Sequence, residues 1–267
     1  MPVTIIVEPH PSGHRFEAVA NVARLAAGTG EVMLLTSRGA SRGDEFNAYL
    51  RDLPLKVDEC FTEVEPQTRE IADAVAAVCR SSDVGTVILM DADQTLKRWW
   101  LVAPSRLRTL RPKPRIVFML TRYPAKLSLT DWVGWRLRVP KATLALLAMG
   151  SGSLRRINGF AGRDDMSTGW LVKRARDPAT CRAHSRDRAV LRRELHLPLD
   201  RKLVGIFGVL TDRKHPQLVH AAVLAAGDDA DLLLAGSVKP DVAGWLDVLP
   251  DEQRSRIVVR DGFLSNE

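Results

Sequence analysis

The sequence predicts an α/β protein with two Rossmann-like domains, each built around a parallel sheet. Two observations predict this fold: short, continuously apolar segments alternate with helical segments, and this alternation occurs in two series separated by an irregular stretch. Strands that are apolar throughout are typical of parallel sheets covered by helices on both faces. The length of 267 residues is sufficient for two ordinary domains. We therefore expect domains over residues 1–175 and 176–267.

The first series of strands and helices occupies the N-terminal half of the chain. Four apolar segments are expected to be strands of one parallel sheet: residues 3–7, 31–36, 86–90 and 116–120. The helical spacing of apolar side chains predicts helices over 16–27 and 71–79. Right-handed crossovers between such strands produce a Rossmann-like domain. The stretch 158–182, rich in Gly, Arg and Asp, is expected to be an irregular crossing between the domains.

The second series begins after this stretch. A polar helix is expected over 185–195 and an apolar one over 217–226. Three segments are expected to be strands of a second sheet: residues 203–207, 231–235 and 257–259. A strand, a glycine turn, a helix and a second strand follow one another here, which is the pattern of a βαβ unit.

Cysteine usage and apolar runs exclude several classes of protein. The three cysteines, Cys60, Cys79 and Cys181, are widely spaced, and no CxxC motif or Cys/His cluster is present. This pattern supports neither a disulfide framework nor a zinc site and favours a reducing cytosol. The N-terminus lacks the basic region of a signal peptide, and the longest apolar run, 142–149, is too short to cross a membrane. We therefore expect a cytoplasmic protein that does not span a membrane.

The stretch FGVLTDRKHPQLVHAA, residues 207–222, has the features of a phosphate-binding turn. The expected strand ends at Gly208, whose missing side chain lets a ligand approach the backbone. The helix that begins near Pro216 directs free N–H groups and a positive dipole end toward this turn. Arg213 and Lys214 add positive charge, so the turn suits a diphosphate. The alternative is a solvated connection with two surface cations.

The same stretch resembles the second domain of retaining glycosyltransferases of family 4, which have the two-Rossmann GT-B fold. The shared pattern is a strand, a glycine, five residues, a lysine and a helix ending in Ala-Ala; RDPA (176–179) and RAVLRRELHLPLD (188–200) resemble the entry into that domain. The resemblance implies transfer of a sugar from a UDP- or GDP-linked donor with retention of configuration. It also implies that Lys214 contacts the donor diphosphate and that no metal or other cofactor is needed. The family commonly has an arginine directly after the glycine; this chain has Val209 there, and Arg213 is the candidate substitute.

The resemblance carries one further expectation about the second domain. Members of the family have two glutamates, eight positions apart, that hold the donor sugar and the nucleotide ribose. No such pair follows the turn at Gly262 and Phe263 before Glu267. We therefore expect an incomplete second domain and little or no transferase activity from the chain as given.

The loop PHPSGHR, residues 9–15, follows the first expected strand and is a candidate acceptor site. Gly13 allows close approach of a ligand, and His14 and Arg15 begin the next helix. Because ligands bind at the carboxyl ends of parallel strands, we assign His14 to catalysis and Gly13 and Arg15 to the acceptor side. We also expect this loop to face the turn at Gly208 across a cleft. The alternative is a solvated histidine.

The segment DADQ, residues 91–94, follows another expected strand at the same edge of the sheet. By the same reasoning we assign Asp91 to catalysis, through a hydrogen bond to an acceptor hydroxyl, and Asp93 to the acceptor side. The alternative, a carboxylate that caps the next helix, is equally compatible with the sequence. No GxGxxG motif follows the first strand, which excludes a typical dinucleotide-binding oxidoreductase.

The middle of the chain is strongly basic and carries tryptophans. Residues 97–202 have a net charge of +18, against −7 for residues 1–96 and −4 for residues 203–267. Such a segment suits phosphates, anionic lipid or nucleic acid, and a solvated arginine-rich surface is the alternative. The second-choice function is accordingly a non-catalytic Rossmann-scaffold binding module for anionic lipid or nucleic acid; for the glycosyltransferase no nucleic acid partner is expected.

The segment TDWVGWRLR, residues 130–138, is the clearest part of this basic region. Trp132 and Trp135 are three positions apart and share a helical face, and Arg136 and Arg138 flank them. Aromatic and basic side chains on one short helix suit the surface of an anionic membrane, so peripheral membrane attachment is a further expectation. The alternative is an ordinary half-buried helix.

Overall fold

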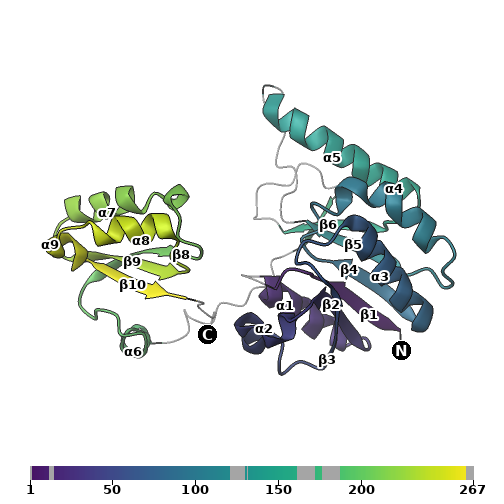
Figure 1. The fold of residues 1–267 in the computed structure, drawn as a ribbon, viewed down its shortest axis with the longest axis horizontal. Helices are drawn as coiled ribbons and strands as arrows, with labels where there is room; N and C mark the ends of the chain where they lie inside the picture. The colour runs from purple at the N-terminus through teal and green to yellow at the C-terminus, as the bar shows by residue number, and fades with distance from the viewer. Residues whose placement is uncertain are drawn as a thin grey trace. The chain divides into compact units, whose positions relative to one another are not determined.

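The structure is a computed structural model of the chain. It describes residues 2–11, 15–120, 130, 132–160, 172–175 and 187–262. The chain folds into two compact units, Met1–Ala179 and Thr180–Glu267, and each unit is described by itself (Figure 1). The domain boundary expected at 175/176 adjoins residues 176–186, which lie outside the described residues.

The first unit contains a parallel sheet of seven described strands. These are β1 (Val3–Val7), β2 (Val32–Ser37), β3 (Leu55–Phe61), β4 (Val84–Leu89), β5 (Arg115–Leu120), β6 (Arg156–Phe160) and β7 (Val172–Ala175). Their order across the sheet is β3-β2-β1-β4-β5-β6-β7. The four strands expected from the sequence are β1, β2, β4 and β5, and all of them lie in this sheet, as predicted. The strand order reverses direction between β1 and β4, which is the switch point of a Rossmann-like sheet.

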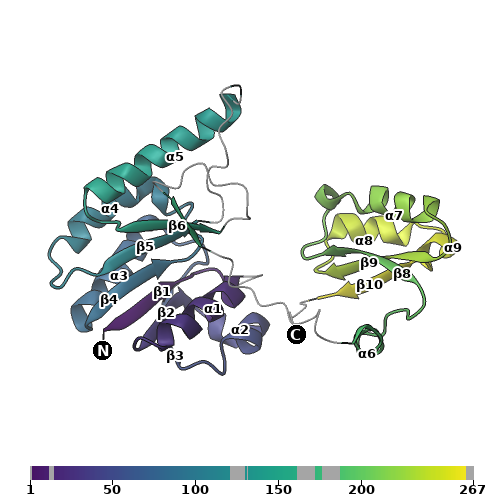
Figure 2. The ribbon, with the colours of Figure 1, turned by 180° about the vertical axis from the view of Figure 1, so that it is seen from behind.

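Helices cover both faces of this sheet, as its continuously apolar strands require (Figures 1 and 2). They are α1 (Arg15–Ala27), α2 (Asp44–Tyr49), α3 (Thr68–Ser81), α4 (Leu96–Leu107) and α5 (Trp132–Gly150). One buried cluster joins Phe16 of α1 to Ile6 and Leu34 of the sheet. A second cluster joins Trp99 of α4 to Phe118 on the opposite face. The central strands β1, β2, β4 and β5 therefore supply residues to two separate cores, one on each face of the sheet.

Three strands of this sheet were not expected from the sequence. The stretch 158–182 was expected to be irregular, but β6 and β7 lie within residues 156–175 and extend the first sheet. The prediction was wrong because a strand at or near a sheet edge needs few apolar residues: β7 reads VKRA. The same reason applies to β3 at the other edge, where polar side chains alternate through LKVDECF and most are exposed.

The helix expected over 130–138 is much longer in the structure. As α5 it continues through Pro140 to Gly150, because the residues after Pro140 are mostly strong helix formers such as Ala and Leu.

The preceding helix, α4, contributes Trp99, which is fully buried against Phe118 with the ring centroids 5.2 Å apart. The indole Nε1 of Trp99 donates a hydrogen bond of 2.9 Å to the carbonyl oxygen of Ser153, so this tryptophan belongs to the core.

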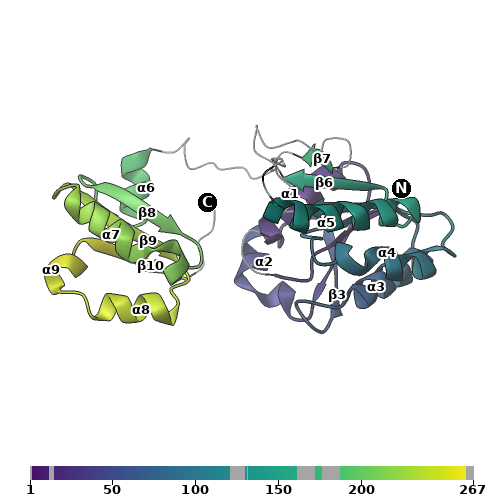
Figure 3. The ribbon, with the colours of Figure 1, turned by 90° about the horizontal axis from the view of Figure 1, so that it is seen from above.

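The second unit contains a smaller parallel sheet. Its described strands are β8 (Lys202–Phe207), β9 (Ala230–Gly236) and β10 (Ile257–Asp261), in the order β10-β9-β8, and they are the three that the sequence predicts. Its helices are α6 (Arg188–Glu194), α7 (Pro216–Ala225), α8 (Pro240–Asp247) and α9 (Asp251–Arg254) (Figure 3). Leu232 and Leu234 of β9 pack against Val242 and Leu246 of α8 and against Ile257 in its core.

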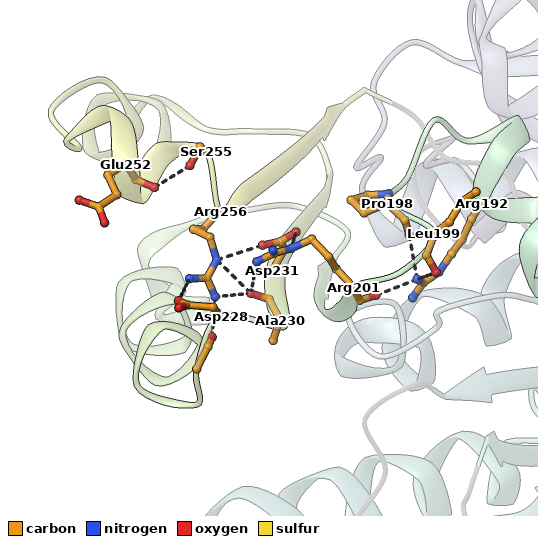
Figure 4. Close-up of polar contacts among 11 residues, drawn as sticks. Arg192, Pro198, Leu199, Arg201, Asp228, Ala230, Asp231, Glu252, Ser255 and Arg256 are labelled. Atoms are coloured by element: carbon orange, nitrogen blue, oxygen red, sulfur yellow. Dashed lines mark hydrogen bonds and ion pairs between the residues drawn. The ribbon is translucent and has the colours of Figure 1, made fainter.

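A buried carboxylate joins the amino ends of these three strands (Figure 4). Asp231 of β9 is 5% exposed, and its oxygens lie 2.5 Å from Nε of Arg201 and 3.1 Å from Nε of Arg256. Arg201 directly precedes β8 and Arg256 directly precedes β10. Arg256 also donates to the carbonyl oxygens of Gly227 and Ala230. The Asp231 carboxylate thus fixes the starts of three parallel strands relative to one another.

We expect Asp231→Asn to lower the free energy of unfolding of the second unit by about 2 kcal/mol, because it removes the buried carboxylate that pairs with Arg201 and with the largely buried Arg256. The matched control is Asp228→Asn, which also removes a partner of Arg256 but at a fully exposed position, and it should leave stability unchanged. Urea denaturation combined with hydrogen exchange of the β8–β10 amides measures both. Equal effects of the two variants would contradict a structural role specific to Asp231.

Candidate functional site

Polar residues of the first unit gather where the strand order reverses. Glu8 directly follows β1, and Asp91 follows β4 after one residue. His10 lies in the loop after β1, and Arg15 is the first residue of α1. We call Glu8, His10, Arg15 and Asp91 the switch-point cluster. Open α/β sheets bind ligands outside the carboxyl ends of their strands at this position.

Arg15 holds the two carboxylates of the cluster together. Its Nη1 donates to Oε1 of Glu8 at 3.2 Å, and its Nη2 lies 2.5 Å from Oδ2 of Asp91. The same Glu8 oxygen accepts a hydrogen bond of 3.0 Å from the backbone N–H of His10. Glu8 is only 1% exposed, whereas Arg15 and Asp91 are partly exposed. Arg15 and Asp91 can therefore contact a polar ligand. The buried Glu8 holds Arg15 in position for this contact.

Burial changes the protonation of this cluster. Desolvation raises the pKa of Glu8 from 4.5 to about 7, although the Arg15 charge and the hydrogen bond from His10 oppose the rise. Burial also lowers the pKa of His10, and the charge of Arg15 lowers it further. Glu8 therefore changes its charge near neutral pH, which is a property common among functional carboxyl groups.

The loop that contains Asp91 and Asp93 is held in an unusual conformation. Asp91 has φ +41°, a left-handed conformation that costs an ordinary residue about 1 kcal/mol or more. Asp93 forms an ion pair with Lys141 of α5. The N-cap residue of α4 is Thr95, so neither aspartate occupies the capping position that the sequence left open. The loop is instead tied to α1 through Arg15 and to α5 through Lys141.

The sequence predicted only part of this cluster. Asp91 and Arg15 form an ion pair at the edge of the sheet to which the sequence assigned both, and their roles stay predictions. Gly13 and His14 lie outside the described residues, and their roles stay predictions as well. Glu8 and His10 were missed. The available signal was a glutamate directly after a strand that is buried almost throughout, since such a position is at the ligand-binding edge of a parallel sheet.

The phosphate-binding turn of the second unit comprises Gly208, Arg213 and Lys214. Gly208 follows β8 with φ +86°, and Gly236 ends β9 with φ +133°. The backbone N–H of Gly208 donates a hydrogen bond of 2.9 Å to the carbonyl oxygen of Ala235. A Cβ atom added to Gly236 would lie 2.1 Å from the carbonyl oxygen of Gly208. Both glycines are therefore required where the two loops meet at the carboxyl edge of the sheet.

The cations of this turn lie beside the start of α7. The Nζ atom of Lys214 donates a hydrogen bond to the carbonyl oxygen of Phe207 and lies over Gly208. Arg213 is exposed. The helix begins at Pro216, as predicted, but a carboxylate also lies at its start, where Asp212 accepts a hydrogen bond of 2.9 Å from the side chain of Gln217. The prediction that this turn faces the loop with Gly13 and His14 concerns the placement of the units relative to one another and stays a prediction.

The tryptophans expected to contact a membrane are exposed. Trp132 is 78% and Trp135 is 36% exposed, both on α5, and Arg136 is exposed beside them. The side chain of Arg138 lies outside the described residues.

None of the described helices is long and apolar enough to cross a membrane. Among the described residues, no group of three or more His, Cys, Asp or Glu residues could hold a metal ion.

Solved structures with a similar fold include a protein bound to UDP-glucose, a glycosyltransferase and a UDP-N-acetylglucosamine 2-epimerase. The structure of Anabaena Alr3699/HepE with UDP-glucose matches 99% of this chain and 70% of its own, with a TM-score of 0.63 and 12% identity. A glycosyltransferase from Rickettsia africae matches 99% of this chain and 69% of its own, with a TM-score of 0.63 and 9% identity. UDP-N-acetylglucosamine 2-epimerase from Rickettsia bellii matches with a TM-score of 0.52 and 12% identity, over 100% of this chain and 70% of its own.

These similarities show the fold of the chain. No family model matches the sequence, and no curated protein matches it. The two parallel sheets and the structural matches together show the GT-B fold with two Rossmann-like domains that the resemblance in the sequence implied. Membership of glycosyltransferase family 4 is not part of what these matches show, because identities of 9–12% establish the fold alone.

We expect Glu8→Gln to change the pH dependence of stability. The unfolded chain ionises this carboxyl near 4.5 and the folded chain near 7, so ionisation disfavours the folded state as the pH rises between these values. The wild type should therefore lose up to about 3 kcal/mol relative to Glu8→Gln between pH 4.5 and 7.5. Urea denaturation at several pH values measures this difference. The exposed Glu63→Gln is the control and should follow the wild type; a Glu8→Gln profile parallel to the wild type would contradict the raised pKa.

We expect Gly236→Ala to destabilise the second unit by more than about 2 kcal/mol, because the new Cβ would overlap the backbone of Gly208 at an unfavourable φ. Gly244→Ala is the control. It lies in α8 with open space around the added atom, so it should stabilise the unit by up to about 1 kcal/mol. Chemical denaturation of both variants checks the close approach; a stable Gly236→Ala protein would rule it out.

Proposed function

We propose that this protein is a glycosyltransferase that moves a sugar from a nucleotide-diphosphate donor to an acceptor. The observation that carries the proposal is the turn of Gly208, Arg213 and Lys214 at the carboxyl edge of the second sheet, in a chain with the GT-B fold. A glycine with positive φ, two cations and the start of a helix suit a diphosphate. The structures of HepE were solved with UDP and with UDP-glucose, which supports a nucleotide-sugar ligand for a protein of this fold.

The donor would bind to the second unit through its phosphates. Lys214 has three N–H donors and uses one of them on the carbonyl oxygen of Phe207, which leaves donors for phosphate oxygens. Arg213 would supply the planar guanidinium that the resembled family commonly has next to the glycine. As the bond between sugar and diphosphate breaks, negative charge increases on the diphosphate, and these cations stabilise it. The proposal includes no metal ion and no cofactor besides the UDP- or GDP-linked donor.

The acceptor would bind to the switch-point cluster of the first unit. Transfer breaks the bond between the anomeric carbon and the diphosphate oxygen, joins that carbon to the oxygen of an acceptor hydroxyl, and passes the hydroxyl proton to the departing diphosphate. Asp91 and His14 are the proposed catalytic residues, with Asp91 accepting a hydrogen bond from the acceptor hydroxyl. Gly13, Arg15 and Asp93 would shape the acceptor side, and Glu8 would hold Arg15 in place. Retention of configuration follows from the resemblance to family 4 and is part of the proposal.

The alternative is a binding module without catalysis, for which anionic lipid is the ligand that a specific observation favours. That observation is the exposed apolar and basic face of α5, around Trp132, Trp135 and Arg136. Glycosyl transfer is preferred because a lipid-binding scaffold needs no phosphate-binding turn at the carboxyl edge of its second sheet. Stabilisation of the second unit by UDP or GDP distinguishes the two, since a ligand that binds the native state raises its stability.

We expect Lys214→Ala to weaken binding of UDP or GDP by about tenfold or more, because each charge-assisted contact contributes roughly 1.5–3 kcal/mol. Isothermal titration calorimetry of the full chain measures the change. Val209→Arg, which introduces the residue common in the resembled family, should leave the affinity unchanged or increase it.

The matched control for this titration is Lys202→Ala. Lys202 lies at the opposite, amino end of β8, where it forms an ion pair with Asp229, and its loss should not change nucleotide affinity. Equal affinities of wild type and Lys214→Ala would remove the main support for a donor site at this turn. Equal losses in both variants would show that only the overall charge matters.

A further inference from the structure

One face of α5 carries several exposed large apolar side chains, with Arg136 and Thr143 among them. Its exposed large apolar side chains are Trp132, Trp135, Val139, Leu146 and Leu147. These positions follow the spacing of a single helical face. From Trp132 to Leu147 they extend about 22 Å along the helix axis, and we call this set of side chains the α5 stripe.

The opposite face of α5 explains how the helix is held while the stripe is exposed. Ala145 and Ala148 are buried in the core, and small side chains let α5 pack closely on its neighbour α4 (Figures 1 and 3). The packing of α5 on the first unit therefore uses these small side chains and does not use the large apolar side chains on its exposed face. A contiguous exposed apolar surface is uncommon on proteins and marks a site of interaction with a membrane, a ligand or another protein.

The charge of this part of the chain selects among these partners. Arg136 lies within the stripe, and Lys97 and Arg98 are exposed on the neighbouring helix α4. Neither α4 nor α5 contains an acidic residue, and the sequence over residues 95–163 has fifteen Lys and Arg residues against one acidic residue, Asp131. Two copies of such a surface would repel one another, which disfavours a symmetric dimer through this face.

We propose that the α5 stripe is a docking surface for an anionic lipid bilayer. Tryptophan prefers the boundary between headgroups and acyl chains, and Leu and Val extend the apolar contact along the helix. Lys and Arg are attracted to anionic headgroups, with about 1 kcal/mol for each cation near the surface. The helix lies in the plane of the bilayer and is not inserted across it.

The docked helix is connected to the switch-point cluster. Lys141 of α5 forms an ion pair with Asp93, two residues after Asp91. The membrane-facing helix and the acceptor-side loop are therefore joined by a direct contact. If the proposed function also holds, the acceptor is an amphiphile presented at the bilayer surface. Membrane docking itself requires neither donor nor acceptor, so its test is independent of transferase activity.

The test uses the full chain and co-sedimentation with two kinds of vesicle, phosphatidylcholine alone and phosphatidylcholine mixed with phosphatidylglycerol. The wild type should bind the mixed vesicles and bind the neutral ones much more weakly. Trp132→Ser combined with Leu146→Ser should lower the partition coefficient by about tenfold or more. Arg136→Gln should lower it about fivefold on the mixed vesicles and leave it unchanged on the neutral ones. Circular dichroism checks that each variant is folded.

The matched control is Leu25→Ser, which removes a single apolar side chain, 74% exposed, from α1. It should bind like the wild type. Equal binding of all variants, or binding that does not depend on phosphatidylglycerol, would overturn the proposal. A wild type that is a dimer in solution, converted to a monomer by Trp132→Ser, would assign the stripe to a protein interface instead.

Discussion

Parallel pairing is the constraint on which the rest of this structure depends. Every described strand pairing in both sheets is parallel. A chain that forms parallel strands must return through a crossover, so helices cover the sheet and all carboxyl ends meet at one edge. That edge collects residues far apart in sequence, Glu8 and Asp91 in the first unit and Gly208 and Gly236 in the second.

The two edges of the sheets differ in how they use polar groups. At the amino edge of the second sheet, Asp231 is neutralised by Arg201 and Arg256, and this network contributes to stability. At the carboxyl edges the backbone has positive φ at Asp91 and Gly208, and polar groups remain partly exposed. The strain at Asp91 and incomplete burial reduce stability, and they are typical of positions where a ligand completes the interactions.

The sequence predicted best those strands that are short, apolar segments between helical ones. All seven expected strands are present, including β8, most of whose residues are exposed, because the alternation of apolar and helical segments is a local signal that does not depend on how completely a strand is buried. β3, β6 and β7 were missed because strands at or near a sheet edge tolerate residues such as those of VKRA. The second half of α5 was not expected from the sequence; it continues the helix past Pro140 because Ala and Leu residues predominate there.

The sequence by itself determined the α/β class, the two series of strands and the positions of the glycine turn and of Asp91, because apolar periodicity and glycine are local signals. Only the tertiary structure decided which charges meet. Arg15 bridges Glu8 and Asp91, residues that are 83 positions apart, and no local pattern records that distance. The raised pKa of Glu8 likewise depends on burial by the surrounding elements. Whether an apolar helix face is covered or exposed, as on α5, depends on packing against neighbours, which the sequence of one helix does not contain.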